Sequence, residues 1–318
     1  MEINKLNAKR CSKFGQSGAI FGIALFEAIK EHPDIVILSA DMSTPAGLDK
    51  FKNTVPENFY NLGIAEQNMT GTAAGFASEG YCPVTVAQAC FISMRSFEQI
   101  RQYCGYMNFP IISVGINAGF ALTYLGNTHY AVEDIGILRT VPELIILSPS
   151  DAWQAAKAFL AAVALKKPVY MRLTGTLNTP VIYESDFNFE IGKAIRIKEG
   201  DDIQIIATGN IVKNVLIAAE LLENDGISTE VIDMHTIKPL DKACISMQSK
   251  LIITVEEHSI INGLGGAVAE YLSSMPNSPK LMKLGVNDTF SKVGDYSYLL
   301  EQHGLTPESI RKSIKEEL

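Results

Sequence analysis

Cysteine is scarce in this sequence and shows no pattern of pairing. The 318 residues contain five cysteines and no CxxC pair: Cys11, Cys82, Cys90, Cys104 and Cys244. An odd, scattered set is typical of reduced thiols that serve as small core residues. The cysteine content therefore favours a cytoplasmic protein.

Basic clusters and long apolar runs are absent as well. The formal net charge is −8, and the lack of a basic cluster argues against nucleic acid or an anionic membrane as a partner. No apolar run is long enough to cross a bilayer. Residues 1–13 are polar and lack the apolar segment of a signal peptide. We therefore expect no nucleic acid and no membrane among the partners.

Apolar residues are plentiful, and runs of them alternate with segments of helical spacing. Hydrophobic residues make up 47% and charged residues 19% of the chain, enough for sizeable cores in two domains. Apolar runs typical of buried strands lie at residues 35–38, 81–87, 110–116, 144–149, 168–173, 203–207, 229–233 and 251–256. Helical patterns between them indicate mostly parallel sheets covered on both faces. These patterns include helices expected at 15–30, at 95–106 and at 152–165, the last with Ser150 and Asp151 at its start. We predict an α/β chain of two doubly wound domains, residues 1–178 and 190–318, with a turn-rich linker at 174–188.

Residues 59–69 carry the most informative chemistry. Residues 59–62 are typical of a short strand, Gly63 breaks it, and a buried helix rich in small residues follows. Glu66 falls in the first turn of that helix, where the helix N-terminus alone favours a carboxylate. Its apolar neighbours allow a second interpretation, because a carboxyl group in an apolar setting can hold or share a proton near neutral pH.

The motif Gly-Ile-Ala-Glu-Gln-Asn at 63–68 resembles that of the pyrimidine-binding domain of transketolases and related thiamine diphosphate enzymes. The resemblance covers nearly the whole chain. It includes Thr-Val-Glu-Glu-His at 254–258 and Gly-Leu-Gly-Gly at 263–266, which are similar to the C-terminal domain of the same family. The resemblance implies a pyrimidine-binding domain followed by a smaller transketolase C-terminal domain.

Thiamine diphosphate is the cofactor that this resemblance implies, and several residues are assigned to its aminopyrimidine ring. Glu66 would bond N1′ of the ring and exchange a proton with it, which makes it a catalytic residue. Ile64 belongs to the same motif, Asp41 would lie near the cofactor, and Phe91 and Phe97 would pack against the ring. On pattern alone, Asp41 is a turn or cap residue, and the two phenylalanines are core residues that do not share a helical face.

The resemblance also assigns residues to the substrate. His129 occupies the position of the family's Thr-His pair and would be catalytic, whereas on pattern alone it is equally a surface residue beside a helix start. Arg172, near the end of a strand, would bind the phosphate of a sugar phosphate, or else pairs with a carboxylate. Leu125 stands where the family has an aspartate that reads a sugar hydroxyl, and Asn117 where it has a histidine. These two changes weaken the expectation of ordinary xylulose 5-phosphate and ribose 5-phosphate specificity.

Half of the family's cofactor machinery has no counterpart in the sequence. The family holds the diphosphate through a metal bound by Gly-Asp-Gly and a pair of asparagines, and this chain has neither motif. It therefore resembles the separate C-terminal subunit of a split transketolase. We expect no metal ligands here. Mg²⁺ or Ca²⁺ would be held by an N-terminal partner subunit, with the cofactor at the interface between the two chains. We also expect the chain to associate with itself, so that the assembled protein would be a heterotetramer.

Three functions remain open at this point. The first is transfer of a two-carbon ketol unit from a ketose, or its phosphate, to an aldose. The second is an acyloin-forming relative, such as a deoxyxylulose phosphate synthase-like enzyme, or the β subunit of a 2-oxoacid dehydrogenase. The third is a non-catalytic regulatory homologue. Ketol transfer is favoured over the second function by Thr128-His129 and by residues 97–101. A non-catalytic role is disfavoured by the retained Glu66, Phe91 and His129.

Overall fold

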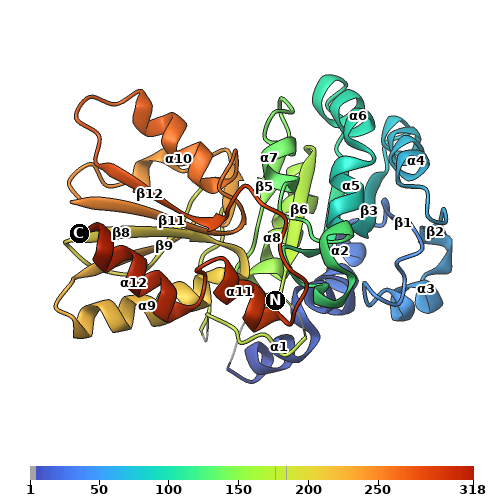
Figure 1. Ribbon diagram of the computed structural model, residues 1–318. Helices are drawn as coiled ribbons and strands as arrows, with labels where there is room; N and C mark the ends of the chain where they lie inside the picture. The colour runs from blue at the N-terminus through green and yellow to red at the C-terminus, as the bar shows by residue number, and fades with distance from the viewer. Residues whose placement is uncertain (1–4, 176, 184) are drawn as a thin grey trace.

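Two sheets with helices on both faces make up the molecule (Figure 1). The structure is a computed structural model and describes residues 5–175, 177–183 and 185–318. Within these residues, the first sheet has seven strands in the order β10-β5-β6-β4-β3-β1-β2, and the second has five in the order β12-β11-β8-β9-β7. This arrangement confirms the predicted α/β class with two doubly wound units.

Six strands of the first sheet run parallel, as the alternation of runs predicts. They are β1 (Ile35–Ser39), β2 (Phe59–Asn61), β3 (Cys82–Gln88), β4 (Ile112–Ala118), β5 (Ile145–Leu147) and β6 (Val169–Thr174). All five residues of β1 and all six of β6 are buried, because helices cover both faces of the sheet. The chain passes from β1 to β2 on one side and to β3 on the other. The carboxyl ends of β1 and β3 therefore flank the point where strand order reverses, which is where open α/β sheets bind ligands.

Each face of this sheet is covered by its own set of helices. One face carries α1 (Lys5–Ala19), the π-helix η1 (Ile20–Ala24), α2 (Leu25–Glu31), α3 (Asp49–Thr54) and α8 (Ala152–Leu165). The other carries α4 (Glu66–Ser78), α5 (Ala89–Met94), α6 (Phe97–Ile100), the π-helix η3 (Arg101–Tyr106) and α7 (Asp134–Leu138). Short 3₁₀ turns lie at η2 (Pro56–Asn58) and η4 (Thr123–Thr128).

The second sheet repeats this plan on a smaller scale. It contains β7 (Ile195–Lys198), β8 (Ile203–Thr208), β9 (Thr229–Asp233), β11 (Leu251–Ser259) and β12 (Lys280–Val286), and only β7 runs antiparallel to its neighbour. Helices α9 (Val212–Asn224), α11 (Tyr296–Gln302) and α12 (Pro307–Glu317) pack toward one face, and α10 (Leu264–Ser273) covers the other. Two further 3₁₀ turns are η5 (Gly209–Ile211) and η6 (Lys242–Cys244).

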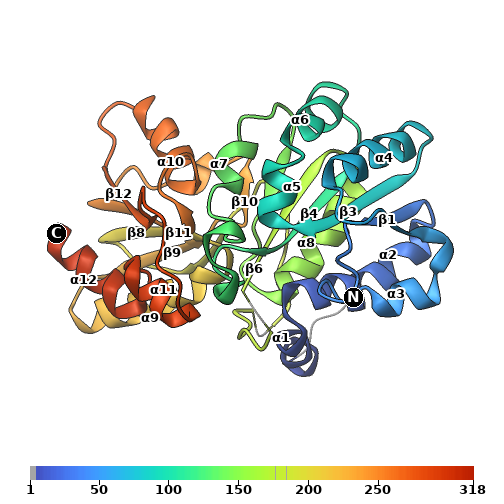
Figure 2. The ribbon, with the colours of Figure 1, turned by 45° about the vertical axis from the view of Figure 1, so that its right-hand side comes forward.

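The two domains share both a sheet and a core. Strand β10 (Thr236–Lys238) follows β9 of the second domain but pairs antiparallel with β5 of the first. One apolar cluster continues from α4, α6 and α7 into β8, β9, β11 and α10. Figure 2 shows α7 and β10 where the two domains meet. The domains are therefore joined by packing as well as by the linker.

Two predicted helices differ from those observed. The expected helix over 95–106 is divided into α6 and η3 and is separated from α5 by a turn at Arg95 and Ser96. The hydroxyls of Ser93 and Ser96 donate to the carbonyls of Ala89 and Ile92, the local bond that bends helices. The expected helix over 15–30 begins instead at residue 5, and Gly15 breaks it with a positive φ of 64°. In the described part of the chain, no helix is long and apolar enough to cross a membrane.

Candidate active site

The first group of predicted site residues lies where β1 and β2 end. Asp41 follows β1 with a positive φ of 57°. Its carboxylate accepts a hydrogen bond from Asn61 Nδ2 at 3.0 Å, and Asn61 Oδ1 accepts from the backbone N–H groups of Asp41 and Gly63, each at 3.1 Å. Asn61 thereby ties the end of β1 to the turn that leads into α4. Ile64, in that turn, exposes 75% of its surface.

Glu66 is the first residue of α4, as predicted, and is only 2% exposed. Its Oε2 lies 2.7 Å from Arg95 Nη1. Its Oε1 accepts no hydrogen bond from the part of the chain that the structure describes. A buried carboxylate with one free oxygen at the rim of a sheet can bond a ligand that has its own donor or acceptor.

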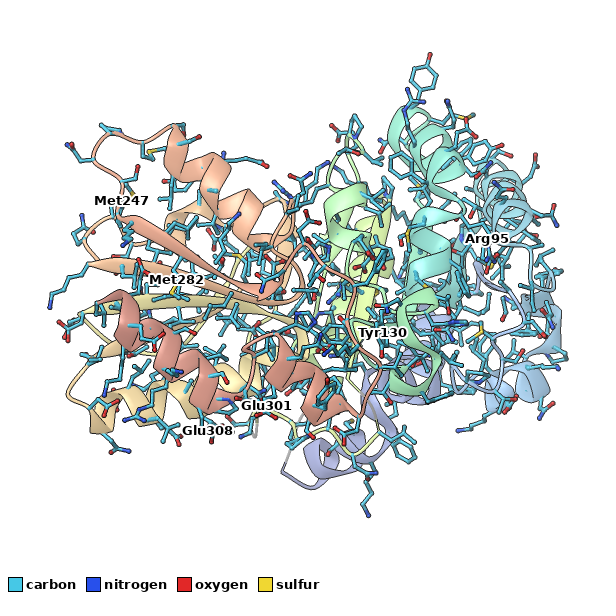
Figure 3. All side chains as sticks on the ribbon, viewed as in Figure 1. Arg95, Tyr130, Met247, Met282, Glu301 and Glu308 are labelled. Atoms are coloured by element: carbon cyan, nitrogen blue, oxygen red, sulfur yellow. The ribbon has the colours of Figure 1, made fainter. Side chains whose placement is uncertain are left out.

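Four side chains form a row that begins at this carboxylate. The guanidinium of Arg95 lies over the ring of Phe91, 4.3 Å from its centroid. Phe91 in turn meets the ring of His129 edge-on, with centroids 5.1 Å apart. The structure therefore brings together three predicted residues, Glu66, Phe91 and His129, from three separate segments. Figure 3 labels Arg95 on the first-domain side of the molecule.

Arg95 is the member of this row that the sequence prediction missed. It lies four residues after Phe91, so one helical turn brings its side chain over that ring. The spacing from Glu66, 29 residues along the chain, gives no sign of an ion pair. Phe97, expected beside Phe91, is half-buried and packs against the apolar cluster of α4 and α6.

Asn117 and Leu125, the two positions that depart from the family pattern, lie near the same edge. Asn117 stands close to the end of β4 with a φ of 55°, and its Nδ2 donates to Gln88 Oε1 at the end of β3 at 3.1 Å. Leu125 lies on η4 and is 40% exposed. His129 follows η4, and its Nδ1 is 2.9 Å from the hydroxyl of Thr128.

A cleft of about 640 Å³ opens beside these residues. Asn117 lines it, together with Leu122 and Tyr124 from the loop before His129 and with Leu173 and Thr174 from the end of β6. The opposite wall comes from residues 13–18 and 44–47. The cleft thus lies along the carboxyl edge of the sheet, and Asn117 is the predicted site residue that lines it.

Arg172 does not lie in this cleft. It is 1% exposed, and its Nε bonds both carboxylate oxygens of Asp134 at 2.9 and 3.0 Å. Its Nη2 donates to the carbonyls of Ala131 and Glu257, both at 2.9 Å. Nearby carboxylates raise the pKa of Arg172 against the effect of burial. This arrangement contradicts the expected contact with a substrate phosphate and supports the other interpretation, pairing with a carboxylate.

The site fits one part of thiamine diphosphate. A buried carboxylate with a free oxygen and a neighbouring aromatic ring suit a flat heterocycle that carries hydrogen-bonding nitrogens. The diphosphate end would require a metal or cationic groups. Among the described residues, no group of three or more His, Cys, Asp or Glu side chains could hold a metal ion.

The sequence matches two family descriptions in tandem. Residues 16–179 match "Transketolase, pyrimidine binding domain", and residues 192–310 match "Transketolase, C-terminal domain". The chain therefore belongs to the transketolase family, and its two domains are those of a transketolase C-terminal section.

Relatives with the same extent support this assignment. The chain is similar to a "Putative transketolase C-terminal section" of Methanocaldococcus jannaschii, with 39% identity over 94% of this chain and 95% of the relative. It is also similar to "6-deoxy-6-sulfo-D-fructose transketolase subunit SqwH" of Clostridium sp. (strain MSTE9), with 36% identity over 92% and 91%. A solved structure, "Split gene transketolase, inactive beta4 tetramer", superposes with a TM-score of 0.86 at 36% identity, covering 94% of this chain and 97% of the other. The similar proteins also include 1-deoxy-D-xylulose-5-phosphate synthases.

Proposed function

We propose that this chain is the C-terminal subunit of a thiamine diphosphate-dependent transketolase. With a partner subunit, it would transfer a two-carbon ketol unit from a ketose, or its phosphate, to an aldose. The observation that carries the proposal is the buried carboxylate of Glu66, with one free oxygen, in a row with Phe91 and His129 at the carboxyl edge of the sheet. The family assignment supplies the kind of cofactor.

The chain's own residues have distinct tasks in this proposal. Bound thiamine diphosphate supplies a carbon nucleophile and holds the electron pair left when a carbon–carbon bond breaks. Glu66 holds a proton that it exchanges with N1′ of the aminopyrimidine ring through Oε1. Phe91 and Phe97 would pack against that ring, and Ile64 and Asp41 would be the further residues that bind the cofactor.

Arg95 and His129 complete the site. Arg95 fixes the Glu66 carboxylate through Oε2, so the other oxygen is presented in a constant direction. His129 is half-buried at the end of the row, and it would bond substrate oxygens. Asn117 and Leu125 shape the substrate end of the site, where the usual histidine and aspartate are missing.

A partner subunit would provide the remainder of the site. It would carry the Gly-Asp-Gly motif and the asparagines and hold Mg²⁺ or Ca²⁺ on the diphosphate, in a cytoplasmic heterotetramer. This part of the proposal is supported by the names of the similar proteins, which include a C-terminal section, a subunit and a split-gene transketolase. Because Arg172 is occupied by Asp134, a phosphate on the substrate would have to be bound by other groups.

Reconstitution tests the proposal. The purified chain should have no measurable transfer activity with thiamine diphosphate and Mg²⁺, since it lacks ligands for the diphosphate. Addition of a partner subunit that carries Gly-Asp-Gly should give turnover of a ketose donor with an aldose acceptor. Full activity of the chain alone would contradict the split assembly, and a complex that binds the cofactor without reacting would support the regulatory alternative.

The donor separates the proposal from its nearest competitor. The similarity to 1-deoxy-D-xylulose-5-phosphate synthases favours, as a second candidate, condensation from a 2-oxoacid donor with loss of CO₂. The reconstituted complex should therefore be offered a ketose and pyruvate in parallel. Release of CO₂ from pyruvate without transfer from any ketose would favour the second candidate.

A further inference from the structure

The segment that carries His129 is a closed loop. It leaves β4 at Gly119 and returns at Ala131, and these two residues exchange both backbone hydrogen bonds, at 2.9 and 3.1 Å. Leu125 and His129 lie between them. Closing the base of a loop restricts the conformations of the residues between its ends, so contacts that fix the base also restrict the loop.

The second domain holds the first end of this base through Glu257. Its Oε1 accepts the backbone N–H of Phe120 at 2.6 Å, and its Oε2 accepts the hydroxyl of Tyr296 at 2.6 Å. A Cβ on Gly119 would come within 2.2 Å of Oε1, and the φ of Gly119 is +66°. Glycine is therefore required here, because the carboxylate packs directly on the loop backbone.

Arg172 holds the other end. The same guanidinium group, through Nη2, donates to the carbonyl of Ala131 and to the carbonyl of Glu257, each at 2.9 Å. Both ends of the loop are thus bonded to one residue of the second domain, directly at Phe120 and through Arg172 at Ala131. These four residues are all buried, and buried hydrogen bonds are strong and costly to leave unmade.

Other residues of the loop also contact the second domain. Phe120 stacks on His303 with centroids 5.3 Å apart and meets Tyr130 edge-on, in an apolar cluster with Val286 and Leu299. Asn127 exchanges two hydrogen bonds with the backbone of Ser291, at 2.8 and 3.1 Å. Figure 3 labels Tyr130 in the middle of the molecule, between the two domains.

We infer that the C-terminal domain positions the loop of residues 119–131, here called the substrate loop. Glu257 is the positioning residue through which it does so. The inference rests on the proposed function for the role of His129, but the hold on the loop is independent of it. Glu257 touches neither the cofactor row nor the cleft. It acts by fixing the base from which His129 and Leu125 are presented to the substrate.

Glu257→Met is the direct test, with Glu256→Met as its matched control. Methionine keeps the length of the side chain but has no oxygen for Phe120 N–H or Tyr296. Glu256 is equally buried and also accepts two bonds, but from Leu264 and Gly265 at the start of α10, within the second domain. Gly119→Ala disturbs the same contact from the loop side, and it decides the question if Glu257→Met does not fold.

Two readouts are measured on wild type and variants. In the purified chain, hydrogen–deuterium exchange of residues 119–131 should be faster in Glu257→Met and unchanged in Glu256→Met. In the reconstituted complex, kcat/KM for ketol transfer should fall about tenfold or more in Glu257→Met only, the scale of one lost bond to a charged group. Hydrogen exchange at C2 of the bound cofactor should stay within a few-fold of wild type, since Glu66 is untouched.

The two proposals fail in different ways. If no partner or ketose gives turnover with wild type, the proposed function fails. Deuterium exchange of residues 119–131 still tests whether Glu257 restricts the loop. If residues 119–131 exchange equally in both methionine variants, or if kcat/KM of Glu257→Met equals that of the control, the positioning role of Glu257 is overturned.

Discussion

Arg172 shows how a single buried charge is held at the centre of this molecule. It pairs with Asp134, which is fully buried and also accepts the hydroxyl of Tyr170 at 2.7 Å. Its remaining bonds reach two backbone carbonyls, one in each domain. Removing one partner of a buried pair leaves the other charge without compensation, which costs more than the pair contributes.

Arg172→Ala should therefore lower the free energy of unfolding by about 3–5 kcal/mol. Urea denaturation followed by the fluorescence of the single tryptophan, Trp153, measures the loss. Arg311→Ala serves as the control, because Arg311 pairs with Asp225 at the surface and little change is expected. Wild-type stability of Arg172→Ala, combined with a raised KM for phosphorylated substrates alone, would restore the phosphate role.

Asp233 is a second buried charge, placed between the linker and both domains. Its Oδ2 accepts hydrogen bonds from Ser150, Gln154 and Tyr183, at 2.7, 2.9 and 2.6 Å. Its Oδ1 has no partner among the described residues. Burial raises the pKa of Asp233 to about 6 from 3.8. The folded chain therefore holds a proton on this carboxyl group at pH values where the unfolded chain has lost it.

The sign of the pH effect follows from this shift. Because the folded pKa of Asp233 is the higher one, its stabilising contribution is full below about pH 4 and is lost as the pH rises through about 6. Asp233→Asn should remove that dependence, on the order of 2 kcal/mol between pH 4 and 7. Asparagine keeps an oxygen for the three donors and cannot titrate. Parallel stability curves for the two proteins across this range would refute the assignment.

Single residues were predictable from the sequence where a short motif carried them. Glu66 stands at the start of its helix, as the motif at 63–68 predicts, and the structure brings Phe91 and His129 into the same row. The partners of these residues were not predictable, because they depend on contacts between distant segments. Nothing local distinguishes Arg95, which reaches Glu66, from Arg172, which is held by Asp134.

At the scale of elements, α8 shows how far local signals extend. The sequence predicts a helix at residues 152–165 with Ser150 and Asp151 at its start, and the structure has α8 at those bounds. Asp151 caps it through Oδ1, which accepts from Trp153 and Gln154. Its Oδ2 accepts from Ile182 and Tyr183 of the linker, a second task that no local pattern indicates.

Asp151→Asn should lower the free energy of unfolding by more than the loss of a helix cap alone. Asparagine retains one acceptor oxygen, so either the helix start or the linker loses two bonds to a charged group, about 3 kcal/mol in total. Thr306→Ala, at the ordinary cap of α12, should cost about 1 kcal/mol. Thermal and urea unfolding of both variants provide the comparison. A cost for Asp151→Asn no greater than that of Thr306→Ala would show that the linker bonds contribute nothing.

Strands that depend on long-range pairing could not be predicted from the sequence. The short strands β7 and β10 contain few residues, and β10 owes its place to pairing with β5 of the other domain. The turn at Arg95 and Ser96, which separates α5 from α6, lies where the hydroxyls of Ser93 and Ser96 bond back to helix carbonyls. Apolar runs and helical spacing, in contrast, located every buried parallel strand of the first sheet except the exact ends.

At the scale of the whole molecule, the two domains form one structure around the substrate loop. They share the apolar cluster that runs from α4 to α10, the strand pair β5–β10, and the bonds of Arg172 and Glu257. The residues proposed to bind the cofactor lie on the first domain, and the second domain bonds the loop that carries His129. The chain therefore carries the part of the proposed site that would bind the aminopyrimidine ring. The proposed partner would add the ligands of the diphosphate.

Glu66→Gln tests the central claim most directly. Glutamine keeps the size of the side chain and can still bond Arg95, so folding and assembly should survive, but it cannot exchange a proton with N1′. In the reconstituted complex, hydrogen–deuterium exchange at C2 of bound thiamine diphosphate should slow by about a hundredfold or more, the scale of losing an acid–base group. Cofactor affinity should fall less, since the contact with Phe91 and the partner's metal site remain. Exchange within a few-fold of wild type would instead make Glu66 a helix-start carboxylate and contradict the catalytic assignment of this chain.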